Sequence, residues 1–266
     1  MSDAPPLQGA LDGPDGAPVL VLGNSLGTSR AVWERQIPAL AARFRLLTYE
    51  LPGHGGAPAG PGPYTVEGLG AGVRALLDTY EIGQAAYCGV SLGAMVGMWL
   101  AATYPERISA LGLICTSAYL PPASGWLARA DAVRSGGMAS IRAASVGRWF
   151  TPAFAAREPD VTARFAADLE RTDVAGYAGC CAAIAAMDLR PLLPGISAPA
   201  LVIAGAQDPA TPPAHGALIA SRAGGRARLR VIRGAAHLAN VAAPGEVTAL
   251  LLDHLISALG ATMLVR

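Results

Sequence analysis

The sequence predicts an α/β domain built on a mostly parallel, doubly wound sheet of about eight strands. Short apolar runs recur along the chain, and each is followed by a segment with helical periodicity. Most of these runs are apolar throughout rather than alternating, which is typical of strands covered by helices on both faces. The length of 266 residues suits one domain with a substantial core.

The expected strands begin near the N-terminus. The residues Asp12-Gly13-Pro14-Asp15-Gly16 have turn-forming composition, and we expect them to join the first two strands in a hairpin. The sheet is therefore expected to begin antiparallel and to continue parallel. The expected strands are 7–11, 19–22, 45–49, 86–90, 111–116, 200–204 and 228–232.

Helices are expected between the strands. Residues 65–81 keep one apolar face at helical spacing, and residues 247–255 do the same near the C-terminus. His254 belongs to this last pattern, so we interpret it as a helix-face residue rather than a catalyst.

The stretch from about 118 to 186 breaks the strand–helix rhythm. It contains helix-like segments rich in aromatic residues and no convincing strand. We interpret residues 119–186 as a helical cap inserted into a core formed by 1–118 and 187–266. Such an insertion can shape a pocket and exclude water, whereas the alternative is a set of extra core helices.

Composition excludes several functional classes. Charged residues make up 15% of the chain and the formal net charge is +1, so no basic stripe for nucleic acid is expected. No signal peptide is evident, and no apolar run has the length of a membrane span, which together favour a cytoplasmic location. The cysteines are interpreted as small buried apolar residues without metal-ligand spacing: Cys88, Cys115, Cys180 and Cys181.

Two serines occur in the frame Gly-x-Ser-x-Gly, which in a nucleophile elbow places a strained serine between a strand and a helix. Ser91 has that context, because residues 85–90 form an expected strand and a helical pattern follows at once from Leu92 to Tyr104. Ser25 follows a strand, but Thr28 or Ser29 is expected to cap a helix that starts only near Arg30. Ser91 is therefore the candidate nucleophile.

A serine hydroxyl needs a base, and the base needs an acid that orients it. Asp208 and His237 each follow an expected strand, so the chain order is Ser91, Asp208, His237, the order found in α/β-hydrolases. Each residue also has a purely structural alternative. Asp208 precedes a proline and could simply open a turn, and His237 could be a hydrogen-bonded loop residue. His54 is expected to hold its own loop.

Acyl transfer also needs donors for the developing oxyanion. The backbone N–H of Leu92 is one candidate, at the start of the helix that follows the elbow. Leu26 is the other, in the loop that follows the 19–22 strand, and Ser25 lies beside it.

Several stretches spread over nearly the whole chain have a recognisable family pattern: 23–28 with Trp33 and Gln36, 62–67, 88–93, 187–192, 203–213 and 234–240. In these stretches the chain resembles α/β-hydrolases and, within that group, the 3-oxoadipate enol-lactonases. One difference is Glu50-Leu51-Pro52-Gly53-His54-Gly55, where relatives usually have Asp-x-Arg-Gly-His-Gly.

This resemblance implies that the substrate is a small enol-lactone bearing a carboxylate and that the reaction passes through an acyl-enzyme. It implies no metal and no organic cofactor. Trp126 and Arg129 resemble a Trp-x-x-Arg pair of the family, and Arg129 is the candidate to bind the substrate carboxylate. The alternative is a solvated cap arginine.

Other functions remain open on the same residues. A broad carboxylesterase or a cofactor-free perhydrolase would use the same three groups, and a ligand receptor on a hydrolase fold would keep them without turnover. The expected partner is a small-molecule lactone, with no nucleic acid or membrane, and the chain is expected to be a monomer or a small homo-oligomer.

Overall fold

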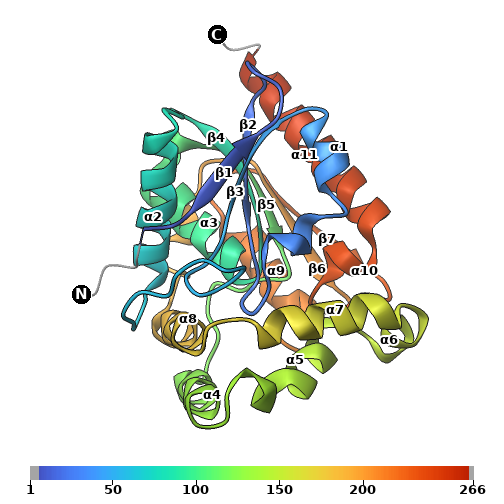
Figure 1. Ribbon diagram of the computed structural model, residues 1–266. Helices are drawn as coiled ribbons and strands as arrows, with labels where there is room; N and C mark the ends of the chain where they lie inside the picture. Colours follow the sequence, from blue (N-terminus) through green and yellow to red (C-terminus); the bar gives the residue numbers. More distant parts are fainter. Residues whose placement is uncertain (1–5, 264–266) are drawn as a thin grey trace.

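A seven-stranded sheet lies at the centre of residues 6–263, the part of the chain that the computed structural model describes (Figure 1). The strand order is β1-β3-β2-β4-β5-β6-β7, and all neighbouring pairs are parallel except β1 with β3. The mostly parallel sheet is therefore confirmed, with seven described strands where about eight were expected. The strands are β1 (Gly9–Asp12), β2 (Val19–Gly23), β3 (Arg45–Tyr49), β4 (Ala85–Val90), β5 (Ile108–Ile114), β6 (Ala200–Gly205) and β7 (Ala227–Ile232).

The expected hairpin between the first two strands is wrong. β1 is antiparallel as predicted, but it pairs with β3, with Gly9 opposite Tyr49. β2 uses both of its edges for parallel pairing, one with β3 and the other with β4. No edge of β2 is left for β1, which instead covers the outer edge of β3, a pairing that local turn composition cannot indicate.

Helices cover both faces of the sheet. α1 and α11 lie on one face, and α2 and α3 lie on the other (Figure 1). The apolar faces expected for residues 65–81 and 247–255 lie within α2 and α11, where Val66, Leu69, Val73, Val247 and Leu251 are buried. The helices of the core are α1 (Ile37–Ala41), α2 (Val66–Thr79), α3 (Leu92–Thr103), α9 (Pro213–Arg222), α10 (Ala239–Ala242) and α11 (Pro244–Met263).

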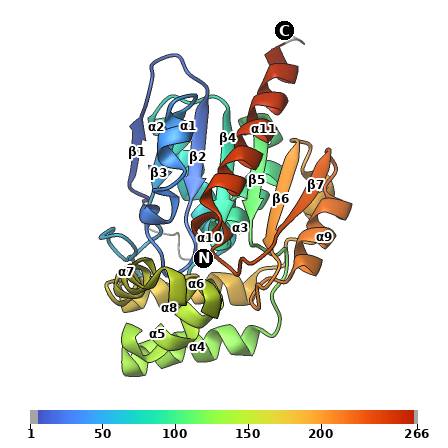
Figure 2. The same ribbon diagram turned by 90° about the vertical axis from the view of Figure 1, so that its right-hand side faces the viewer.

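Five further helices lie between β5 and β6 and gather at one end of the sheet (Figure 2). Their interior is aromatic: the Phe150 ring stacks on Phe154 at 4.9 Å and meets Phe165 edge-on at 5.6 Å between centroids. We propose that this group is the cap expected from the sequence. Its helices are α4 (Ala123–Gly136), α5 (Arg142–Trp149), α6 (Pro152–Arg157), α7 (Pro159–Glu170) and α8 (Val174–Ala186).

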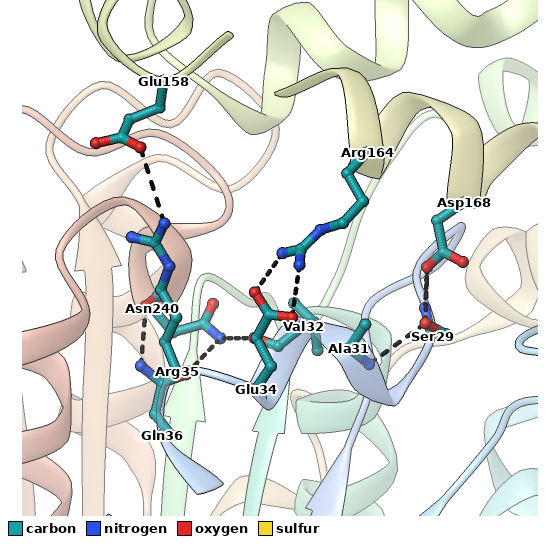
Figure 3. Close-up of polar contacts among 10 residues, drawn as sticks. All are labelled: Ser29, Ala31, Val32, Glu34, Arg35, Gln36, Glu158, Arg164, Asp168 and Asn240. Atoms are coloured by element: carbon teal, nitrogen blue, oxygen red, sulfur yellow. Dashed lines mark hydrogen bonds and ion pairs between the residues drawn. The ribbon is translucent and has the colours of Figure 1, made fainter. Parts of the chain in front are cut away.

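Helix α7 is joined to the core by polar contacts, as Figure 3 shows. Ser29 donates its hydroxyl to Asp168 at 2.7 Å, and its backbone N–H donates to the same oxygen at 3.1 Å. Arg164 and Glu34 form a bidentate ion pair, in which each terminal guanidinium nitrogen donates to one carboxylate oxygen. Ser29 is also the N-cap of the short 3₁₀ helix η1 (Arg30–Trp33), which agrees with the capping role predicted for Thr28 or Ser29.

The structure also bears on the cysteines and on possible membrane-spanning helices. The four cysteines are buried free thiols, as predicted, and burial raises the pKa of Cys88 and of Cys115 to about 12. None of the described helices combines the length and the apolar character that a bilayer crossing requires.

Candidate active site

Ser91 occupies the sharp turn between β4 and α3. Its backbone has φ 53° and ψ −113°, a left-handed conformation that few non-glycine residues adopt. The glycines on either side of it are required by close packing. A Cβ on Gly89 would lie 2.4 Å from the backbone of Gly93, and a Cβ on Gly93 would lie 2.4 Å from the backbone of Gly23. The Gly-x-Ser-x-Gly frame therefore has a steric basis at this position.

The three candidate catalytic residues meet in one hydrogen-bonded chain. Ser91 Oγ lies 2.9 Å from His237 Nε2, and His237 Nδ1 lies 2.8 Å from Asp208 Oδ2. All three side chains are buried. They come from three loops that follow β4, β6 and β7, so the carboxyl ends of parallel strands bring them together across the sheet.

Asp208 is held as a carboxylate. Oδ1 accepts hydrogen bonds from the backbone N–H groups of Ala210 and Thr211, and Oδ2 accepts from the Thr211 hydroxyl at 2.7 Å. Burial acts to raise the pKa of Asp208, but the neighbouring His237 and these donors outweigh it and lower the pKa to about 2. A carboxylate that accepts from Nδ1–H selects the tautomer in which Nε2 faces Ser91 as a base.

The His237 loop also contacts the end of α5. The His237 N–H donates to the Arg148 carbonyl at 3.3 Å, and the Leu238 N–H donates to the Trp149 carbonyl at 3.1 Å. The histidine backbone is thus fixed by the helical insertion as well as by the sheet.

The two candidate oxyanion donors lie on adjoining loops. The Gly93 N–H donates to the Asn24 carbonyl at 3.0 Å, which joins the elbow to the loop that carries Leu26. Leu92 is the first residue of α3, so its N–H has no acceptor within the helix. Within residues 6–263, the Leu26 N–H likewise has no protein acceptor. Both groups are therefore free to bind an anion.

Side chains behind this loop hold it in place. The Gly27 N–H donates to His54 Nε2 at 3.0 Å, while His54 Nδ1 donates to the Pro52 carbonyl at 2.9 Å. Burial lowers the pKa of His54 to about 4, so the ring is neutral and Nε2 can accept. His54 therefore holds its own loop through Pro52, as expected. It also holds the loop that includes Leu26, which the sequence did not indicate.

Glu50 supports the other side of the same loop. Its carboxylate accepts hydrogen bonds from Asn24 Nδ2 at 3.0 Å and from the Arg30 N–H at 3.0 Å. Burial raises the pKa of Glu50 to about 7 in spite of these donors. From the sequence, Glu50 differs from the Asp that relatives usually have, but its supporting role could not be predicted.

A cavity of about 390 Å³ opens beside Ser91 and His237. Its walls come from the loop that carries Leu26 and from the helical insertion, and the insertion supplies most of the lining residues. The lining residues include Ser25, Leu26, Pro121, Pro122, Trp126, Arg129, Ile141, Arg148, Trp149 and Ile184. All three residues that the sequence assigned to substrate binding, namely Ser25, Trp126 and Arg129, are therefore among them.

Arg129 is anchored within the cavity wall. Its Nη2 donates to Ser145 at 2.7 Å, and its guanidinium carbon lies 5.7 Å from the Trp126 ring and 5.5 Å from the Tyr177 ring. It has no carboxylate partner among the described residues.

Arg148 lines the same cavity and was missed by sequence analysis. Burial lowers the pKa of Arg148, and the nearby Arg129 guanidinium lowers it further. Nothing in the local sequence distinguishes Arg148 from the other arginines of the insertion, because only the packing of α5 turns it toward the cavity.

A larger cavity of about 930 Å³ lies elsewhere, between η1, β3 and α7. It contains Glu50, Arg30 and Asp168 but none of Ser91, Asp208 and His237. Size alone would favour this cavity, but the paired hydroxyl, imidazole and carboxylate place the candidate active site in the smaller one. Across residues 6–263, no three His, Cys, Asp or Glu side chains are grouped to hold a metal ion.

Residues 18–244 match the family described as alpha/beta hydrolase fold. The chain belongs to the alpha/beta hydrolase family. The match covers most of the sheet together with the elbow, Asp208 and His237, so the family and the geometry agree on the same fold.

Among alpha/beta hydrolases, this chain is similar to enol-lactonases. It is 40% identical over 227 residues to 3-oxoadipate enol-lactonase 2 of Acinetobacter baylyi, covering 85% of this chain and 84% of the relative. The crystal structure of the enol-lactonase from Burkholderia xenovorans has a TM-score of 0.91 at 41% identity, covering 94% of this chain and 96% of that one. A hydrolase from Pseudomonas aeruginosa has a TM-score of 0.89 at 44% identity, covering 96% and 94%. The chain is therefore a hydrolase of this type.

Proposed function

We propose that this hydrolase opens a small carboxylated enol-lactone, 3-oxoadipate enol-lactone, with water to give 3-oxoadipate. The observation that carries the proposal is the Ser91–His237–Asp208 chain of hydrogen bonds at the wall of a cavity that also contains arginine. Relatives named 3-oxoadipate enol-lactonase at 35% and 40% identity support the choice of lactone.

The first half of the reaction forms an acyl-enzyme. Ser91 Oγ attacks the lactone carbonyl while its proton passes to His237 Nε2, and Asp208 stabilises the resulting imidazolium. The carbonyl oxygen becomes an oxyanion that accepts from the N–H groups of Leu26 and Leu92.

The ring C–O bond then breaks, the enol oxygen takes the proton from His237, and the acyl-enzyme is formed. The enol becomes a ketone, which disfavours re-closure of the ring. The second half of the reaction releases the acid. Water gives a proton to His237 as its oxygen attacks the acyl carbon, the C–O bond to Ser91 breaks, and Ser91 Oγ takes the proton back from His237. Apart from the substrate, these steps require only water and the three side chains, so no cofactor is proposed.

The substrate carboxylate requires a cation in a mostly apolar pocket. We place Arg129 there, with Trp126 and Ser25 as further contacts, because all three line the cavity next to Ser91. A guanidinium that stacks on aromatic rings keeps its hydrogen-bonding edge available to a carboxylate.

The decisive measurement is steady-state opening of 3-oxoadipate enol-lactone by the wild type and by Ser91→Ala. The wild type is expected to complete many turnovers, and Ser91→Ala to lower kcat by about 10⁴-fold or more, because the nucleophile is lost while oxyanion donors remain. Undiminished opening by Ser91→Ala would reject the mechanism.

The same assay separates the alternatives. A ligand receptor would show at most one turnover, and a broad carboxylesterase would show kcat/KM on phenyl acetate equal to or above that on the lactone. Asp208→Asn is a second check, expected to lower kcat by about 10⁴-fold without loss of fold, because the imidazole would hold the wrong tautomer.

A further inference from the structure

The candidate active site carries positive charge that the protein does not balance. Arg129 and Arg148 both line the cavity beside Ser91, and no Asp or Glu is among its lining residues. Two guanidiniums that share a partly desolvated space repel each other, and such charge is favourable only when an anion completes the site.

The two arginines differ in what holds them. Arg129 donates to Ser145 and lies over two aromatic rings, so part of its hydrogen-bonding capacity is already used. Among the described side chains, Arg148 has neither an ion pair nor a hydrogen-bond acceptor for its half-buried guanidinium. Within residues 6–263, both arginines therefore keep donors for a ligand, because Arg129 Nε is buried without a partner and the Arg148 side chain makes no hydrogen bond. They differ in that Arg129 is held in place by Ser145 and the two rings.

Arg148 is also connected to the catalytic base. Its backbone carbonyl accepts from the His237 N–H at 3.3 Å. The backbone of Arg148 is thus fixed next to His237, and its side chain lines the same cavity as Ser91.

The hydroxyl, imidazole and carboxylate act equally on a ring ester and on an open-chain ester. The choice of substrate therefore depends on the residues that line the cavity. A volume of about 390 Å³ lies at the small end of ligand sites, which admits short substrates only. We propose that the protein also hydrolyses monoesters of short dicarboxylic acids, with Arg148 binding the free carboxylate beside Arg129.

The proposed step balances without a co-reactant. Ser91 Oγ forms a bond to the acyl carbon, the bond from that carbon to the alcohol oxygen breaks, and the alcohol leaves with the proton from His237. Water then gives a proton to His237 as it attacks the acyl carbon, the bond from that carbon to Ser91 Oγ breaks, Oγ takes the proton back, and the dicarboxylate leaves. This proposal rests on the serine-hydrolase chemistry of the proposed function but not on the lactone as substrate.

The test compares monomethyl glutarate with methyl pentanoate, which has the same acyl length but a methyl group in place of the carboxylate, by proton release at constant pH. The wild type is expected to prefer monomethyl glutarate in kcat/KM. Arg148→Met should lower kcat/KM for monomethyl glutarate by roughly 10- to 100-fold, mostly through KM, since a hydrogen-bonded charge pair is lost. Methyl pentanoate should change less than about twofold, because it has no charge to lose.

Two variants serve as controls. Arg148→Lys keeps the charge and should recover part of the loss. Arg134→Met removes an exposed arginine of α4 that pairs with Asp131 outside the cavity, and it should leave both esters unchanged. Should Arg148→Met fail to fold, inhibition of the wild type replaces it: glutarate should inhibit at least tenfold more strongly than butyrate.

Each remaining outcome is decisive. Equal losses on both esters in Arg148→Met, or a wild type that prefers methyl pentanoate, would overturn the proposal. If the wild type opens the lactone but not the half-ester, this inference fails and the proposed function stands. If it hydrolyses the half-ester through Arg148 but not the lactone, the proposed function fails and this inference stands.

Discussion

Single side chains outside the proposed triad hold the loop that carries Leu26, one of the two proposed oxyanion donors. His54 accepts from the Gly27 N–H, and Glu50 accepts from Asn24 Nδ2, so the loop that carries Leu26 is held from both sides. Neither side chain lines the cavity beside Ser91. Their effect on the reaction would therefore be indirect, through the position of a backbone N–H group.

Because the pKa of Glu50 is raised, the stability of the folded protein is expected to depend on pH. Its pKa is about 7 in the folded protein against an ordinary value of 4.5, so the folded state holds the proton more tightly than the unfolded state. The contribution of protonated Glu50 to the free energy of unfolding is fully present below pH 4.5 and is lost as the pH rises through about 7. We therefore expect the Tm of the wild type, measured relative to Glu50→Gln, to fall between pH 5 and pH 8.

The matched control is Glu106→Gln, which removes an exposed carboxylate far from the loop. A Tm difference between wild type and Glu50→Gln that stays constant from pH 5 to pH 8 would contradict the assignment of a raised pKa to Glu50.

At the scale of elements, the junction of β4 and α3 depends on close backbone packing. Gly93 lies against Gly23, and the Gly93 N–H donates a hydrogen bond to the Asn24 carbonyl. The elbow and the loop that carries Leu26 therefore form one packed unit. A side chain at this point would push the two loops apart, and with them the two proposed oxyanion donors.

Gly93→Ala is accordingly expected to destabilise the protein by about 1–3 kcal/mol and to lower lactone turnover strongly in whatever protein remains folded. The control is Gly147→Ala in α5, where a Cβ would meet nothing within 4 Å. That change should be neutral or stabilise by up to about 1 kcal/mol. Urea unfolding measures both, and equal free energies of unfolding for the two variants would refute the packing argument.

At the scale of the whole molecule, the helical insertion and the sheet share the site. The sheet supplies Ser91, Asp208 and His237, and the insertion supplies Arg129 and Arg148. The polar contacts of α7 in Figure 3 form a seam between these two parts. The ion pair in this seam is partly exposed, with side-chain exposures of 46% for Arg164 and 39% for Glu34.

Exposed ion pairs contribute little, so this seam is expected to depend on packing rather than on charge. A double-mutant cycle with Glu34→Gln and Arg164→Met should give a coupling free energy of at most about 1 kcal/mol, with kcat/KM on the lactone unchanged. A coupling above about 3 kcal/mol, or loss of activity in either single variant, would show instead that the ion pair holds the insertion in its working position.

Sequence patterns were informative where a structure is local. The elbow, the strand–helix order and the capping role near Ser29 follow from residue spacing, because backbone sterics and hydrogen bonding act between neighbours. Failures came from pairings between distant segments. The turn at 12–16 suggested a hairpin, yet β1 pairs with β3 because both edges of β2 are taken.

Local patterns predict the order of the strands along the chain, the serine between two glycines at the elbow and the three candidate catalytic residues. That Ser91, His237 and Asp208 meet within hydrogen-bonding distance follows only from the packing of the whole chain. The same packing brings Arg148 to the cavity and places Glu50 and His54 where they support the loop that carries Leu26. These arrangements depend on which helix packs over which strand end, a consequence of burying apolar surface across the whole chain that no local spacing records.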